Sequence, residues 1–155
     1  MISYFPAAVS RRKPDWFSGS LRREHKEIVS LLNEIYAAVH EDLRVLAAMG
    51  IRTLIDLVIT DKVGDIGSFP TKLFAVEKEE FISPKNREFL EVTIDAGSAS
   101  AHRGFKPSQE DLKLLLDITE NLIASIYVLP GQVKALSTKV PPRSQKKSET
   151  EKRRL

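Results

Sequence analysis

Apolar residues recur every three or four positions along most of this chain, which is the period of an amphipathic α-helix. These stripes predict helices over residues 21–39, 43–58, 71–80, 84–103 and 108–129. No segment alternates apolar and polar residues with a period of two for long enough to form a strand. The pattern therefore predicts an all-α fold, a compact bundle of about five helices.

Short polar signals mark where several of these helices begin and end. Ser83 is expected to cap a helix whose first position is Pro84, since proline has no N–H to leave unpaired there. Ser108 and Asp111 have the spacing of a capping box, in which each residue binds the backbone N–H of the other. Residues 62–70 are predicted to be a loop, and Pro130-Gly131 is expected to stop the last helix.

The chain divides into an arm, a body and a tail. Residues 1–19 lack a helical repeat and form a predicted N-terminal arm, with Trp16 and Phe17 expected to hold it against the body. Residues 20–136 form the predicted helical domain. Residues 137–155 are basic and rich in Ser, Lys and Pro, so we expect a disordered C-terminal tail, which cannot bury enough apolar surface to fold.

Charge is distributed unevenly along the chain. The net charge of all 155 residues is +3, yet residues 24–136 hold twelve Lys and Arg against eighteen Asp and Glu. An acidic body is unsuited to gripping nucleic acid by charge, because affinity for phosphates comes mainly from clustered cations. Two interpretations of the basic tail stay open: Lys146-Lys147 and Lys152–Arg154 contact nucleic acid, or they keep an acidic domain soluble.

Composition limits where the protein is expected to be located and which metals or cofactors it is expected to bind. The chain contains no cysteine, and its longest apolar run, residues 122–129, is far too short to span a membrane. Residues 1–9 carry no leading positive charge of the kind found in secretory signals. We therefore expect a cytoplasmic protein with no membrane association. The acidic cluster at residues 77–80 has no histidine at ligand spacing, so no metal site and no cofactor is predicted.

A run of small residues, 96–101, leads into His102 and Arg103 and is the one candidate site. Gly97 and Ala101 lie four positions apart, so they can line one helix face and let a second helix approach closely. On that interpretation, which we favour, His102 bonds the last carbonyls of its helix. The alternative is a shallow cleft in which His102, Arg103 and Arg52 bind a nucleotide or a phosphate.

Four short motifs, in this order, carry a resemblance to a known family: Pro14-x-Trp16, residues 47–55 around Arg52, Gly97-x-x-x-Ala101-His102, and Tyr127-x-Leu129-Pro130. Over about residues 14–136 the chain resembles the domain-of-unknown-function family 4145. Those domains are helical and are similar to the HEPN superfamily of ribonucleases, toxins and nucleotide-binding modules. The resemblance implies a HEPN-like bundle, often dimeric, in bacterial proteins frequently linked to defence against foreign nucleic acid.

The resemblance also provides a test for catalysis. Active HEPN ribonucleases carry an arginine, roughly four to six intervening residues and a histidine, and they cleave RNA without metal. If His102 is that histidine, the arginine position is occupied by Asp95, Ala96 or Gly97. We therefore expect a non-catalytic module, with a role in defence or stress, that forms a homodimer through the small-residue helix or the last long helix. The alternative is an RNA-cleaving or nucleotide-modifying enzyme with a degenerate site around His102.

Overall fold

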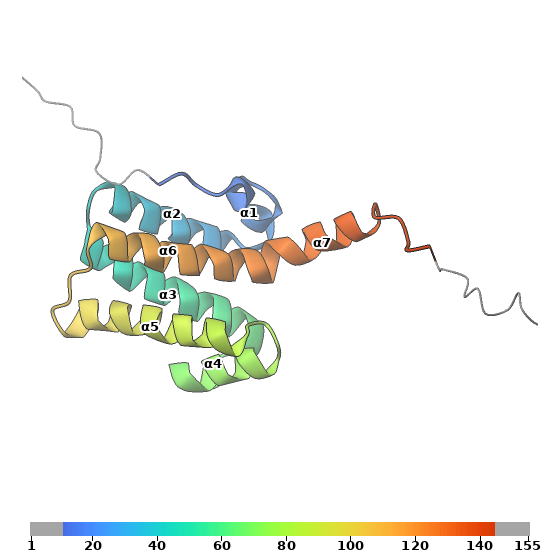
Figure 1. Cartoon of the computed structure of the whole chain (residues 1–155). Helices are drawn as coiled ribbons and strands as arrows, with labels where there is room; N and C mark the ends of the chain where they lie inside the picture. Colours follow the sequence, from blue (N-terminus) through green and yellow to red (C-terminus); the bar gives the residue numbers. More distant parts are fainter. Residues whose placement is uncertain (1–10, 145–155) are drawn as a thin grey trace, which may run out of the picture.

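The computed structural model describes residues 11–144, and within that range it contains helices and no strands (Figure 1). This confirms the all-α prediction. The elements are the 3₁₀ turn η1 (Asp15–Ser18), α1 (Ser20–Glu24), α2 (Lys26–His40), α3 (Arg44–Val63), α4 (Phe69–Lys78), α5 (Pro84–His102), α6 (Gln109–Ile123), the π-helical segment η2 (Ala124–Val128) and α7 (Leu129–Ser137).

Four long helices, α2, α3, α5 and α6, lie side by side and reverse direction from one to the next along the chain, with α4 along one edge (Figure 1). Helix α3 is the centre of this bundle, because it contacts α2, α4, α5 and α6. A helix that is apolar around most of its circumference has to be buried. Helix α3 is of this kind, and seven of its apolar residues are inaccessible to solvent: Ala47, Ala48, Ile51, Leu54, Ile55, Val58 and Ile59.

The helix starts predicted from serine are confirmed. The Ser83 hydroxyl accepts a hydrogen bond from the Asn86 backbone N–H at 3.1 Å. The Ser108 hydroxyl accepts from the Asp111 N–H at 3.0 Å, and the Asp111 carboxylate accepts from the Ser108 N–H at 2.8 Å. Both signals act within one helical turn, so the local sequence is enough to specify them.

Helix boundaries differ from the prediction at four places. Helix α3 extends to Val63, past the predicted end at residue 58 and into the predicted loop. The stripe of residues 21–39 is interrupted at His25, whose backbone is not helical. Helix α4 begins at Phe69, inside the predicted loop. The predicted stop at Pro130-Gly131 is wrong, since the chain passes through η2 into α7. A π turn is wider than an α turn, and Pro130 then occupies the first turn of α7, where no N–H is needed.

The described part of the arm, residues 11–19, packs against the bundle. Phe17 is buried, and its ring centroid lies 5.8 Å from that of Tyr36 on α2. Arg11 forms ion pairs with Asp117 and Glu120 on α6. Residues 1–10 and 145–155 lie outside the described range, and so do the basic clusters and most of the tail for which disorder is predicted.

Candidate functional site

The small-residue run lies where α5 crosses α3. Gly97 is buried, and a Cβ atom added there would stand 2.5 Å from the Cβ of Arg52 and 2.8 Å from the carbonyl oxygen of Ala48. These distances leave no room for any side chain, so glycine is required for the two backbones to approach this closely. Thr93 and Ser100, four positions before and three after Gly97, are buried as well. Ala101 is exposed and does not belong to the crossing.

Arg52 is half-buried beside this crossing. Its guanidinium carbon lies 5.7 Å from the centre of the Phe69 ring on α4, and its buried Nε has no hydrogen-bond partner among the described residues. The side chain lines a groove of about 250 Å³ between α3, α4 and α5, together with Phe69, Pro70, Leu73, Glu91, Ile94, Asp95 and Ser98. Arginine is therefore used here to stack on an aromatic ring.

Arg103 is engaged by Asp95. Its guanidinium forms an ion pair with the Asp95 carboxylate and donates to the Asp95 backbone carbonyl at 3.1 Å. Glu91, one turn earlier, pairs with Arg87 at 2.7 Å. The carboxylates of the groove are thus compensated by arginines of the same helix. A phosphate entering this groove would have to displace these carboxylates from their arginines, which makes the surface a poor anion site.

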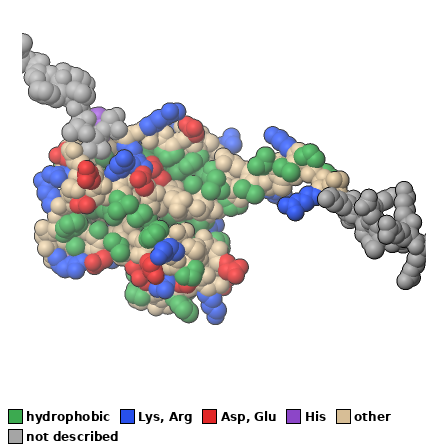
Figure 2. Space-filling model, viewed as in Figure 1, with side chains coloured by type: hydrophobic (Ala, Val, Ile, Leu, Met, Phe, Trp, Pro, Cys, Tyr) green, Lys and Arg blue, Asp and Glu red, His purple; other side chains and the backbone are tan. Residues whose placement is uncertain are grey.

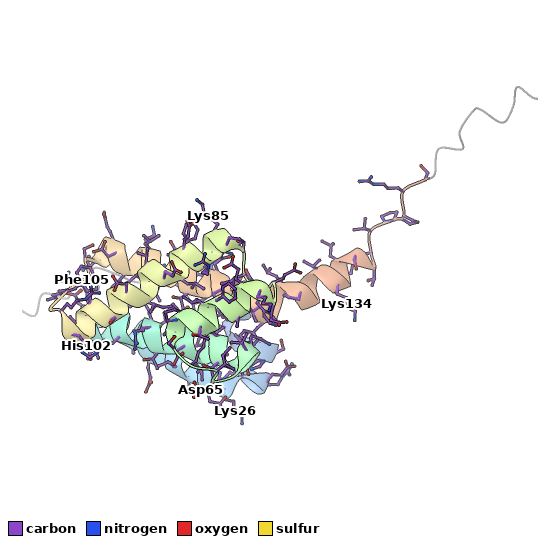
Figure 3. All side chains as sticks on the ribbon, turned by 90° about the horizontal axis from the view of Figure 1, so that it is seen from below. Lys26, Asp65, Lys85, His102, Phe105 and Lys134 are labelled. Carbon is purple, nitrogen blue, oxygen red and sulfur yellow. The ribbon has the colours of Figure 1, made fainter. Side chains whose placement is uncertain are left out.

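His102 is the last residue of α5, at the end of that helix farthest from α7 (Figure 3). Its side chain is exposed and forms no hydrogen bond or ion pair with the described residues. The carbonyl-capping role expected of it is not seen: the N–H groups of Arg103 and Phe105 both donate to the Ala99 carbonyl, at 2.8 and 3.2 Å. Gly104, with φ +69°, then turns the chain away.

The three candidate residues are therefore positioned separately. Arg52 stacks on Phe69, Arg103 pairs with Asp95, and His102 faces solvent. Sequence reasoning missed Phe69, because residues 62–70 lacked a stripe. A usable signal was present in Ser68-x-Pro70, which resembles the Ser83-Pro84 helix start in placing a proline in the first turn after a serine N-cap.

A second feature was missed because the last helix was expected to end at Pro130. Helix α7 continues from α6 and projects away from the bundle (Figure 1). Three apolar side chains at helical spacing lie along it with 44 to 60% of their surface exposed, Leu129, Val133 and Leu136, and the exposed Val140 follows three residues after the helix ends. Figure 2 shows these hydrophobic side chains gathered on the projection, with Lys and Arg at its edges.

Ionisable groups with shifted pKa values lie away from the groove and serve the structure. Hydrogen bonds to Asp65 and Asp56 raise the pKa of the buried Lys72 ammonium. Burial, followed by a hydrogen bond to a carboxylate, raises the pKa of Tyr36 and of Tyr127. Within residues 11–144 no three acidic or histidine side chains gather as metal ligands do, and no helix in that range has the length and apolarity that a membrane crossing requires.

Comparison with known families decides where the chain belongs. The model of a domain of unknown function (DUF4145) matches residues 33–139. The chain is a member of the DUF4145 family. The matched range starts within α2 and extends past the end of α7, so the projecting helix is part of the DUF4145 domain. Comparisons with curated proteins and with solved structures each found no match.

Proposed function

We propose that this DUF4145 domain is a non-catalytic, HEPN-like interaction module that associates with a second copy of itself. The observation that supports this proposal is the apolar stripe of α7. Helix α7 makes its main contacts with η2, from which it continues, so the stripe is left in water. Burying such a face against another protein surface is favourable, and exposing it in a monomer is not.

The geometry around His102 supports the non-catalytic part of the proposal. General-base chemistry needs a cation within reach of the charge that develops on the phosphate. The nearest arginine in sequence, Arg103, is paired with Asp95, and Arg52 stacks on Phe69. An exposed histidine without an oriented partner lacks the positioning that a ribonuclease site requires.

Sedimentation equilibrium over a range of concentrations tests self-association. The chain of 17.4 kDa is expected to sediment as a dimer. The Leu136→Lys variant should raise the dimer Kd by roughly 30-fold or more, since the loss of burial occurs once in each copy. Leu46→Lys is the matched control, because Leu46 on α3 is 57% exposed against 60% for Leu136. A wild-type chain that stays monomeric at about 100 μM would overturn the proposal.

Incubation with labelled RNA tests the absence of catalysis. The RNA is expected to remain intact. His40 provides the matched control for His102, since both are exposed and each ends a helix. Cleavage that is abolished by His102→Ala and kept by His40→Ala would establish the enzyme instead.

A further inference from the structure

An apolar groove lies between α5 and α6, at the end of the bundle next to α7. Its volume is about 200 Å³, and its apolar walls are Phe81, Ile82, Phe89, Leu90, Ile118 and Leu122. Asn86, Asp117, Asn121 and Ser125 complete its lining. The groove continues past Phe81 and Ile82 into a wider hollow of about 640 Å³ beside the end of α4, which Glu77 and Glu80 border.

The groove and the stripe of α7 lie along one unbroken helical stretch, formed by α6, η2 and α7. Ile118, Leu122 and Ser125 line the groove, and Leu129, Val133 and Leu136 form the stripe, with Val140 just past the end of α7. Within α6 and within α7 the steps are three or four residues, the spacing of a helix–helix packing seam, and the π turns of η2 separate the two halves. Helix α5 covers the α6 half of the seam, while the α7 half extends beyond the bundle (Figure 1).

Helix α7 cannot fill the groove of its own chain. It continues in the direction of α6 through η2 and leads away from the bundle, so it does not fold back onto that groove (Figure 1). A second copy, turned by a two-fold rotation beside η2, has its α7 running in the opposite direction. That α7 then lies over the first copy's α6, and the same rotation places the first α7 on the second groove.

Charge favours this arrangement. Residues 121–144 contain Lys134, Lys139 and Arg143 and no acidic residue. The bundle that would receive them, residues 24–128, holds eleven Lys and Arg against eighteen Asp and Glu. Of the acidic side chains along the groove and its hollow, Asp117 pairs with Arg11 and Glu77 with Arg87, whereas Glu80 has no ion pair among the described residues. A basic C-terminal segment is attracted to an acidic bundle at long range.

We infer that two copies exchange α7, each laying its apolar stripe into the α5–α6 groove of the other. This inference rests on the self-association proposed above and names the surface that performs it. The two helices α6–α7 run antiparallel across the two-fold axis. Equal spacing on both sides of the axis places Val133 opposite Asn121 and Leu136 opposite Ile118 of the partner copy.

Engineered cysteines test the exchange cleanly, because the chain has no cysteine of its own. A tagged Val133→Cys chain is mixed with an untagged Asn121→Cys chain and oxidised under mild conditions. The expected product is the mixed disulfide, at a yield at least 10-fold above that of Val133→Cys mixed with Leu46→Cys. Leu46 is exposed on α3 and lies outside the groove, so it controls for random collision.

The outcomes separate the two proposals. A dimer that forms only the Val133→Cys to Val133→Cys disulfide would show that the two α7 helices pair with each other. That result overturns the exchange and leaves self-association intact. A chain that is monomeric by sedimentation and forms no mixed disulfide overturns both. Circular dichroism of each cysteine variant verifies that the bundle is still helical, and Phe89→Cys provides a second groove position.

Discussion

Replacing Gly97 by alanine adds one methyl group at the tightest contact between α3 and α5. The new Cβ would meet the Cβ of Arg52 at 2.5 Å and the carbonyl oxygen of Ala48 at 2.8 Å. Neither atom is the flexible end of a side chain, so relief requires one helix to move away from the other. Moving α5 disturbs the largest helix pairing of the fold, since α3 packs more extensively against α5 than against any other element.

Two effects of opposite sign set the magnitude for Gly97→Ala. Alanine in a helix interior is favoured over glycine by about 1 kcal/mol. Overpacking a close contact costs about 1–3 kcal/mol, and the rigid neighbours of Gly97 place this site at the upper end. The net expectation is a loss of roughly 1–2 kcal/mol in the free energy of unfolding. For a chain of this length that lowers the Tm by roughly 2–8 °C.

Thermal unfolding followed by circular dichroism measures this change. Gly131→Ala is the matched control: Gly131 also lies in a helix, α7, but a Cβ added there meets no atom within 4 Å. That variant gains helix propensity without any clash, so its Tm should not fall. A Gly97→Ala protein as stable as the wild type would refute the close approach of α3 and α5 at this position.

Three further predictions follow from the described contacts and the tail. Ser108→Ala removes one half of the capping box and should cost about 0.5–2 kcal/mol of stability; because the bonds to Ser108 hold the pKa of Asp111 below its usual value, an NMR titration should find that pKa higher in the variant. The raised pKa of Lys72 means that its ion pairs stabilise the fold from neutral pH up to the usual lysine value of 10.5 and are lost as the pH rises through the raised value. Urea unfolding of Lys72→Met and wild type should therefore differ at neutral pH and converge at strongly alkaline pH. A chain that ends at Ser144 loses Lys146, Lys147 and residues 152–154; if the tail binds nucleic acid, the deletion should abolish a salt-sensitive gel shift while leaving the helical signal intact, and a shift that persists would place the binding site in the body.

The features predicted correctly from the sequence are those decided within a few neighbouring residues. The capping box of Ser108 and the start at Ser83 depend on hydrogen bonds that span three positions. The helical stripes depend on a period that any buried helix face must obey. The prediction failed at Pro130, where the outcome depends on how η2 redistributes backbone hydrogen bonds over a wider turn.

The candidate site could be predicted only in part from the sequence, because its contacts depend on how the helices pack together. The small-residue run indicated a close helix crossing, and Gly97 occupies it, but which neighbour it meets is decided by α3. The sequence placed Arg52 and Arg103 as cations available to a ligand. Their actual partners, Phe69 and Asp95, are brought to them by the packing of α4 on α3 and by the turn that ends α5.

By itself, therefore, the sequence determined that this protein is a bundle of capped amphipathic helices, because period and capping are local properties. Tertiary structure alone decided that α7 leaves the bundle with its apolar stripe uncovered, beyond the end of the α5–α6 groove. An apolar stripe looks the same in sequence whether its own fold buries it or not. Only the direction in which η2 sends the helix makes the stripe of α7 a surface for another molecule.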